Sequence, residues 1–242
     1  MTPRFEPRRH PHWNALRCRC DRRLAWHWHP LRIADRAFDL ALPSDPDQVL
    51  TTVCRQTSNR SAADTSDPFW AQVWPSTRGI DRFLADRDLT ALPVLELGCG
   101  VGAGGLAAVA RGARVTFTDG ATDPLLLLRL TLARNAIDGC TIRRLRFGID
   151  RIDRRFSLII GSDVTYLRHC WPGLLDTLAS HLTPGGEVLL SDPYRSLVTE
   201  FVERVATPRW RVESHHVALD DTAIRVLRLT AQTLGKGFSD RA

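Results

Sequence analysis

From residue 93 onward the chain alternates between short apolar runs and helical patterns, and few folds accommodate that alternation. Apolar runs typical of buried strands occupy residues 94–97, 114–118, 141–147, 156–161 and 187–190. Repeated strand–helix units require a parallel sheet with helices on both faces. Two further runs, 209–217 and 224–231, are separated by a short connection only, as in an antiparallel hairpin. The pattern predicts an α/β fold with a seven-stranded, doubly wound, Rossmann-like sheet and a C-terminal antiparallel hairpin.

The composition is that of one globular domain. Of 242 residues, 43% are apolar and 25% are charged, and no apolar run approaches the 18 residues of a membrane span. The net charge of +6 lies entirely within residues 1–36, so bulk charge gives no reason to expect the body to bind nucleic acid. The six cysteines are scattered and no secretory signal precedes them. We therefore expect free thiols and a cytoplasmic protein.

The arginine-rich, histidine-rich and tryptophan-rich residues 1–30 are predicted to be a disordered basic extension. A zinc site built from Cys18, Cys20, His27 and His29 is one alternative, although the two cysteines stand closer together than in a standard finger. A mitochondrial presequence is another. The composition changes after Pro30, so the predicted units are an accessory region at 31–92, a core at 93–234 and a tail at 235–242.

Ligands of open α/β sheets bind beyond the carboxyl ends of the strands. The first core strand ends in Glu96-Leu97-Gly98-Cys99-Gly100-Val101-Gly102, a turn whose glycines let a ligand approach the backbone. Asp119 ends the next strand, where a carboxylate can accept hydrogen bonds from ribose hydroxyls. The alternatives are a tight turn without a ligand and a solvated loop acid. Together the two features predict a bound adenosine nucleoside, without choosing the cofactor.

The choice of cofactor comes from a resemblance. Residues 94–102 (VLELGCGVG) and 115–119 (VTFTD) resemble the first two motifs of the seven-stranded S-adenosylmethionine-dependent methyltransferases. Three further segments restrict the resemblance to one group within this superfamily: 68–76 (PFWAQVWPS), 162–166 (SDVTY) and 192–195 (DPYR). In combination they resemble the protein-lysine methyltransferases with an Asp-x-x-Tyr motif, closest to the branch that methylates the β-subunit of electron transfer flavoprotein. The similarity covers residues 32–231.

The resemblance implies an S-adenosylmethionine cofactor, a lysine-bearing protein substrate and no metal site. It assigns the cofactor contacts to Trp74, Glu96, Gly98, Cys99, Gly100, Gly102, Asp119, Phe147 and Ser162. It makes Asp163 and Tyr166 the candidate catalytic residues, with Asp163 accepting a hydrogen bond from the amine and Tyr166 walling its channel. The structural alternatives are a turn cap for Asp163 and core packing for Tyr166 and Trp74. The oligomeric state is left open.

The chain departs from this family at three positions. Arg146 stands where relatives carry an acid, so it cannot accept a hydrogen bond from the adenine amino group. Phe147 replaces a tryptophan and can still stack on the base. Tyr194 stands where glycine is usual and is expected to fill part of the acceptor channel.

Four other functions compete with lysine methylation. A small-molecule amine or pyridine N-methyltransferase would have the same cofactor motifs but a lidded acceptor site. Nucleic-acid methyltransferases commonly carry Asn/Asp-Pro-Pro-Tyr/Phe where this chain has Asp163-Val164-Thr165-Tyr166. A degenerate binding module would have lost Asp163 or the glycines, and both are present. An NAD-dependent dehydrogenase fits only the glycine pattern of Gly100, Gly102 and Gly105.

Overall fold

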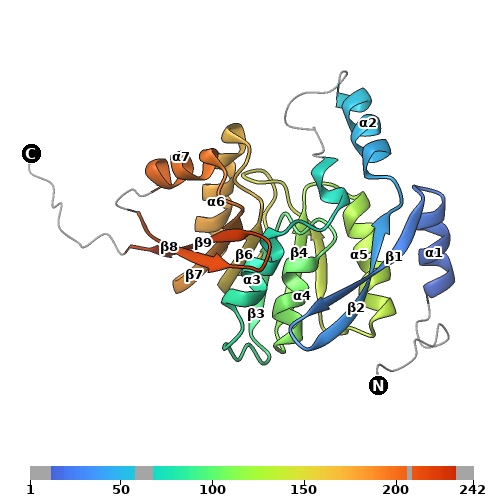
Figure 1. Cartoon of the computed structure of the whole chain (residues 1–242), viewed down its shortest axis with the longest axis horizontal. Helices are drawn as coiled ribbons and strands as arrows, with labels where there is room; N and C mark the ends of the chain where they lie inside the picture. The colour runs from blue at the N-terminus through green and yellow to red at the C-terminus, as the bar shows by residue number, and fades with distance from the viewer. Residues whose placement is uncertain (1–11, 58–67, 206–208, 233–242) are drawn as a thin grey trace, which may run out of the picture.

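A seven-stranded mixed sheet runs through the centre of the computed structural model, which describes residues 12–57, 68–205 and 209–232 (Figure 1). The strand order is β5-β4-β3-β6-β7-β9-β8. The strands are β3 (Pro93–Leu97), β4 (Arg114–Asp119), β5 (Thr141–Arg144), β6 (Phe156–Ser162), β7 (Leu182–Asp192), β8 (Trp210–Ala218) and β9 (Ala223–Ala231). Strands β3 to β7 pair in parallel, whereas β9 is antiparallel to both β7 and β8. The predicted fold class, including its C-terminal hairpin, is confirmed.

Helices cover both faces of this sheet. One face packs against α3 (Ser76–Phe83), α4 (Ala103–Ala110) and α5 (Asp123–Arg134), and the other against α6 (Trp171–His181) and α7 (Ser196–Val205). The side chains of β3 alternate between the faces: Val94 joins the apolar cluster of the first face, and Leu95 and Leu97 join that of the second. Glu96 lies two residues after Val94 and therefore points to the same face, where its carboxyl lies beneath α4.

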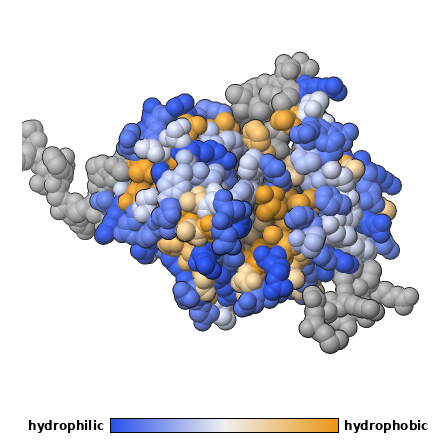
Figure 2. All heavy atoms as spheres, viewed as in Figure 1, coloured by the Kyte–Doolittle hydropathy of each residue, from blue (hydrophilic) through white to orange (hydrophobic). Residues whose placement is uncertain are grey.

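The helix α4 is buried along nearly its whole length, which explains its sequence of alanine, glycine, leucine and valine. A hairpin of β1 (Trp26–Ile33) and β2 (Arg36–Pro43) lies over the sheet face that carries α4 and α5 (Figure 1). Apolar residues gather in the hollow between this hairpin and the β8–β9 end of the molecule (Figure 2). A helix covered on all sides needs no polar face, and small side chains let its neighbours approach closely.

The prediction of a disordered extension is wrong for residues 12–30. Residues 13–21 form the helix α1 (Trp13–Asp21), which packs against α5. Trp13, Leu16 and Cys20 are buried there and recur at helical spacing. The apolar stripe is short, and outward-pointing arginines lie between its members. The high arginine content of the segment therefore suggested disorder although one face of the helix is apolar. Residues 1–11 lie outside the described part of the chain.

Polar contacts fix the hairpin to α5. The Ala41 N–H donates to Thr131 Oγ1 at 3.0 Å, and the Asp39 N–H donates to Asn135 Oδ1 at 2.9 Å. The Trp28 ring stacks on Trp13 at 6.3 Å between centroids. The accessory unit therefore begins at α1 and not at residue 31. Within the described ranges no group of three or more side chains could hold a metal ion.

Two strand boundaries differ from the predicted ones. Strand β5 ends at Arg144, so Phe147 lies in a turn and not in a strand. Strand β7 already begins at Leu182, and Pro184-Gly185-Gly186 lie within it beside an irregularity in its pairing with β6. The helix α2 spans Pro46–Thr57. The predicted tail lies outside the described residues. Short 3-10 helices, η3 (Pro68–Ala71) and η4 (Arg168–Cys170), complete the element order.

The described helices and cysteines bear on two further expectations. No helix in the ranges given above is long and apolar enough to cross a bilayer. The five cysteines whose side chains are described are free thiols: Cys18, Cys20, Cys99, Cys140 and Cys170. Burial raises the pKa of the Cys20 thiol to about 11, because the charged thiolate is disfavoured away from water.

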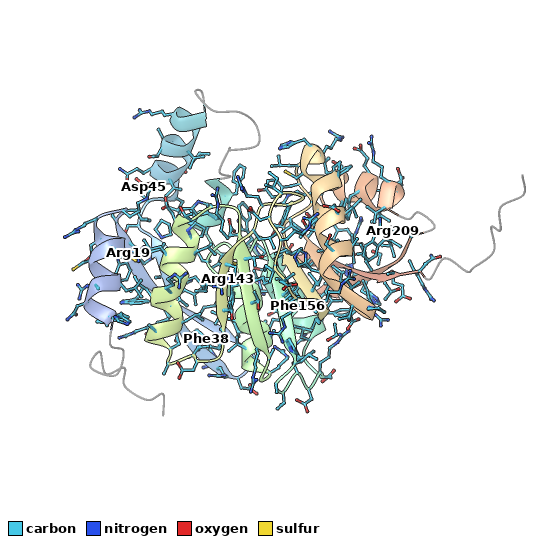
Figure 3. The ribbon with its side chains drawn as sticks, turned by 180° about the vertical axis from the view of Figure 1, so that it is seen from behind. Arg19, Phe38, Asp45, Arg143, Phe156 and Arg209 are labelled. Carbon is cyan, nitrogen blue, oxygen red and sulfur yellow. The ribbon has the colours of Figure 1, made fainter. Side chains whose placement is uncertain are left out.

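The packing of α1 gives a first testable prediction. We expect Trp13→Ala to lower the free energy of unfolding by about 3 kcal/mol, because truncating a buried tryptophan leaves a cavity. Arg19 lies on the exposed side of the same helix (Figure 3), so Arg19→Ala is the matched control and should change stability by less than about 0.5 kcal/mol. Urea denaturation measures both. Equal stabilities for the two variants would contradict the packing described for α1.

Candidate functional site

A cavity of about 860 Å³ lies where the carboxyl ends of β3, β4 and β6 meet. Ten of the eleven predicted site residues line it: Trp74, Glu96, Gly98, Cys99, Gly100, Asp119, Phe147, Ser162, Asp163 and Tyr166. These residues come together largely because neighbouring parallel strands end at the same edge of the sheet. Gly102 is the exception.

The turn from β3 into α4 is built from backbone conformations that favour glycine. Gly98 and Gly100 have φ of 57° and 50°, in the left-handed region. The Gly100 N–H donates to Asp119 Oδ2 at 2.9 Å, and the Ala121 N–H donates to Asp119 Oδ1 at 2.8 Å. A carboxylate offers about four lone-pair sites, so Asp119 can hold this turn and still accept from ribose hydroxyls.

Three glycines after the turn serve packing. A Cβ on Gly102 would lie 2.5 Å from Leu128 Cδ1, so Gly102 faces α5 and not the cavity. A Cβ on Gly104 would lie 2.6 Å from Glu96 Oε1, and one on Gly105 would lie 2.3 Å from Phe117 Cε1. These two glycines let the start of α4 rest directly on Glu96. The sequence pattern marked Gly105 only as part of a dinucleotide motif and did not mark Gly104.

Glu96 is the least solvated carboxyl group of the cavity wall, at 2% exposure. Its Oε1 accepts the Gly105 N–H at 2.7 Å, and its buried Oε2 has no hydrogen-bond partner among the described residues. Burial raises the pKa of Glu96 to about 8, the Gly105 bond opposes this rise, and the charge of Asp119 adds to it. A buried carboxyl with one unpartnered oxygen fits a cationic ligand, which would restore the ionised form.

The end of the cavity beside Phe147 and Ile149 suits a flat ring. Phe147 Cζ lies 3.8 Å from the position of a Cβ on Gly98, and Ile149 is 52% exposed at the cavity rim. Arg146, also on the wall, donates through Nε and Nη2 to Asp150 at 2.9 and 3.0 Å. The Arg146 bonds lower the pKa of Asp150 to about 2. The charge of Arg146 is therefore balanced inside its own turn.

Another part of the wall carries Asp163 and the rings of Phe69, Trp74 and Tyr166. Asp163 is 8% exposed and adopts a left-handed φ of 54°, which Asp tolerates better than most residues. Its Oδ1 accepts from Arg195, whereas its buried Oδ2 has no partner within the described part of the chain. The Phe69 ring packs edge-on against both Trp74 and Tyr166, with centroids 6.2 and 5.9 Å away.

Two notable residues of this wall were not among the predicted site residues, and Tyr194 lies elsewhere than expected. Phe69 and Arg195 both line the cavity, and the segments that carried the family resemblance were the available signal for them. Tyr194 is outside the cavity wall; its hydroxyl bonds to His216 Nδ1 at 2.7 Å. The expectation that Tyr194 fills the acceptor channel is therefore wrong. Ser162 is placed as predicted, and its Oγ accepts from Ser191 Oγ at 3.1 Å.

Comparison with known proteins assigns the family. A family model described as a methyltransferase domain matches residues 70–231, which include β3 to β9 and nearly the whole cavity wall. The chain belongs to this family. Its sheet and its glycine turn are those of an S-adenosylmethionine-dependent methyltransferase domain, so the predicted fold family and cofactor are confirmed. The unpartnered Glu96 oxygen fits that cofactor, which is a cation at sulfur.

Two curated relatives are protein-lysine methyltransferases. A protein N-lysine methyltransferase of Danio rerio is 34% identical over 50% of this chain and 58% of its own length. The electron transfer flavoprotein β-subunit lysine methyltransferase of Xenopus laevis is 32% identical over 54% of each chain. The chain thus spans little more than half the length of these relatives. Among solved structures, an rRNA methyltransferase from T. thermophilus has a TM-score of 0.59 and 20% identity, over 86% of this chain and 51% of its own, which shows a shared fold.

The raised pKa of Glu96 gives a stability prediction. The carboxyl ionises near its ordinary value of 4.5 in the unfolded chain and near 8 in the folded chain. Between these values the folded state binds one more proton, so the free energy of unfolding falls as pH rises. Glu96→Gln keeps an acceptor for the Gly105 N–H and cannot ionise. We expect the stability of the variant relative to wild type to increase from about pH 5 to pH 8 and then level off.

Urea denaturation across that pH range measures this difference. Glu203→Gln, which removes an exposed carboxyl on α7, is the matched control and should show no such increase. A difference between Glu96→Gln and wild type that stays constant with pH would mean that Glu96 is ionised in the folded protein throughout.

Proposed function

We propose that the protein is an S-adenosylmethionine-dependent N-methyltransferase whose acceptor is a lysine of a protein substrate. The observation that carries the proposal is the end of the cavity at Asp163. An unpartnered carboxylate oxygen there lies on a wall of aromatic side chains, in the same cavity as the glycine turn. An amine needs such a hydrogen-bond acceptor to orient it and an apolar wall to exclude water.

The cofactor, when bound, supplies a methyl group already activated on a sulfonium. The residues of the chain then hold and align the reactants. Asp119 holds the ribose, Phe147 stacks on the adenine, and Glu96 offers its unpartnered oxygen to positive charge. Backbone N–H groups at the Gly100 turn are already bonded to Asp119, so the turn is fixed before binding.

The acceptor amine has to be neutral, because only then does nitrogen have a lone pair to attack the methyl carbon. Neutralising a lysine of pKa near 10.4 at pH 7.4 costs about 4 kcal/mol. The rings of Phe69, Trp74 and Tyr166 exclude water and lower this cost, since desolvation disfavours the ammonium form. Asp163 Oδ2 accepts one amine N–H, which turns the lone pair away from the carboxylate. Asp163 and Tyr166 remain the proposed catalytic residues.

The shape of the mouth supports a protein substrate over a small amine. Phe69 and Ile149 are 46% and 52% exposed at the rim, although both are large apolar side chains. Exposed apolar residues around an opening are typical of surfaces that another protein covers. The names of the curated relatives support the same class, and the electron transfer flavoprotein β-subunit is the first acceptor to test.

The cofactor assignment is tested by Asp119→Ala. The substitution removes charge-assisted hydrogen bonds of about 1.5–3 kcal/mol, so S-adenosylmethionine affinity should fall roughly 10- to 150-fold. Isothermal calorimetry measures the affinity, and NAD serves as the control ligand for which wild type should show no binding. Unchanged cofactor affinity in the variant would contradict the role of Asp119.

The catalytic assignment is tested by Asp163→Asn. We expect cofactor affinity to stay within a few-fold, because Asp163 faces the acceptor. Turnover should fall about 10²-fold or more, since a lost transition-state hydrogen bond of about 3 kcal/mol has that effect. Transfer of a labelled methyl group to the electron transfer flavoprotein β-subunit, or to a protein labelled in a lysate, measures turnover.

The possible outcomes separate three roles for Asp163. A fall in cofactor affinity with turnover preserved at saturation would place Asp163 in the cofactor site, and no change in either would make it a turn cap.

If only small amines accept label, the small-molecule alternative replaces the protein substrate. Label on a protein histidine instead of a lysine would show that the acceptor is histidine. The fold and the cofactor assignment would not change.

A further inference from the structure

Arg195 is placed so that it contacts three parts of the acceptor end at once. Its Nη1 donates to Asp163 Oδ1 and, at 2.9 Å, to Asp192 Oδ2. Its guanidinium carbon also lies 5.8 Å from the centre of the Trp74 ring. Arg195 thus joins the end of β6, the end of β7 and the segment before α3. The side chain lies on the cavity wall and is 32% exposed.

The turn between β7 and α7 is itself fixed so that Arg195 points back to the sheet. Tyr194 has a left-handed φ of 59°, which is uncommon for a bulky residue. The Tyr194 hydroxyl is bonded to His216 on β8, and the Arg225 guanidinium lies 4.5 Å from the centre of the Tyr194 ring. The Arg195 N–H donates to Asp192 Oδ1 at 2.9 Å, which closes the turn. The surrounding strands thus compensate for the strained backbone at Tyr194.

We propose that Arg195 is a positioning residue for methyl transfer, holding one oxygen of Asp163 so that the other faces the acceptor amine. The inference rests on the proposed N-methyltransferase function. Without Arg195, the Asp163 side chain would keep neither its orientation nor a partner for Oδ1, since only 7% of the side chain is exposed to water. A planar guanidinium donates to two carboxylates in a fixed geometry that a single ammonium does not reproduce.

Arg195 has a second consequence for the charge of the acceptor. A carboxylate alone favours a neighbouring amine in its ammonium form, which has no lone pair to attack the methyl carbon. The positive charge of Arg195 offsets that of Asp163, so the carboxylate can accept an N–H from the neutral amine without stabilising the ammonium. The pKa of Arg195 is raised: burial lowers it, but the bonds to Asp163 and Asp192 outweigh that effect. Arg195 therefore stays charged at every working pH.

The test compares Arg195→Gln, Arg195→Lys and a control arginine whose partner lies on β7. Arg87→Gln removes an ion pair to Glu187 on β7 that is buried to a similar degree, far from the acceptor end. We expect Arg195→Gln to keep S-adenosylmethionine affinity within about threefold and to lower kcat about 10- to 100-fold. We expect Arg195→Lys to recover part of that loss and Arg87→Gln to leave kcat within about twofold. Parallel losses of cofactor affinity and kcat in Arg195→Gln would overturn the proposal.

A double-mutant cycle with Asp163→Asn asks whether Arg195 acts through Asp163. If it does, the double variant should be no slower than Asp163→Asn alone, because the second substitution removes a support for a group already lost. Independent effects whose logarithms add would overturn the proposal. Circular dichroism and melting curves of each variant identify losses that come from misfolding, and Arg195→Lys covers the case in which the glutamine variant is unfolded.

A structural readout separates this proposal from the proposed function. In crystals of Arg195→Gln grown with S-adenosylhomocysteine, we expect the Asp163 carboxyl to have turned from its wild-type orientation. An unchanged orientation would overturn the positioning role, whatever the acceptor. A turned carboxyl combined with a wild-type protein that methylates no protein or amine would instead refute the proposed function and leave the Asp163–Arg195 contact as a structural device.

Discussion

The whole site depends on carboxylates at strand ends that accept hydrogen bonds from the backbone of the glycine turn. Glu96 Oε1 takes the Gly105 N–H and Asp119 Oδ2 takes the Gly100 N–H. Glu96 thus bonds to the first turn of α4, and Asp119 bonds to the turn that leads into it. The contact is possible only because Gly104 and Gly105 have no side chains to separate the helix from Glu96. The floor of the cavity is thus fixed before any ligand arrives.

The same geometry leaves one carboxyl oxygen unsatisfied on each of two acids of the cavity wall. Glu96 Oε2 and Asp163 Oδ2 are both buried without hydrogen-bond partners among the residues that the structure describes. Leaving a buried acceptor unpaired costs about 1–3 kcal/mol, so these two atoms carry a cost that a bound donor or cation would relieve. Under the proposed function, Glu96 faces the positively charged cofactor and Asp163 faces the acceptor amine.

The N-terminal region has a different relation to the site. The helix α1 and the β1–β2 hairpin cover α4 and α5, whose other faces pack on the sheet that holds the glycine turn. Thr131 accepts a hydrogen bond from the hairpin backbone, and Asn135 both accepts one from it and donates one to it. The helix α5 therefore fixes the position of the hairpin. An all-apolar α4 would otherwise expose alanine and valine to water, at roughly 25 cal/mol for each Å² of apolar surface. The hairpin therefore protects the helix that begins at the cofactor turn.

The sequence by itself determined the order of strands and helices along the chain, the glycine turn and the strand-end residues that line the cavity. Those features are local: a strand end marked by Glu96, Asp119 or Asp163 can be read from the residues beside it, and parallel strands necessarily end at one edge. Only the tertiary structure decided that Trp13 and Cys20 are buried, that Gly102 faces Leu128, and that Arg195 reaches Asp163. Each of these contacts joins segments far apart in the chain. Charge and spacing along a sequence do not specify which distant side chain supplies the other half of a contact.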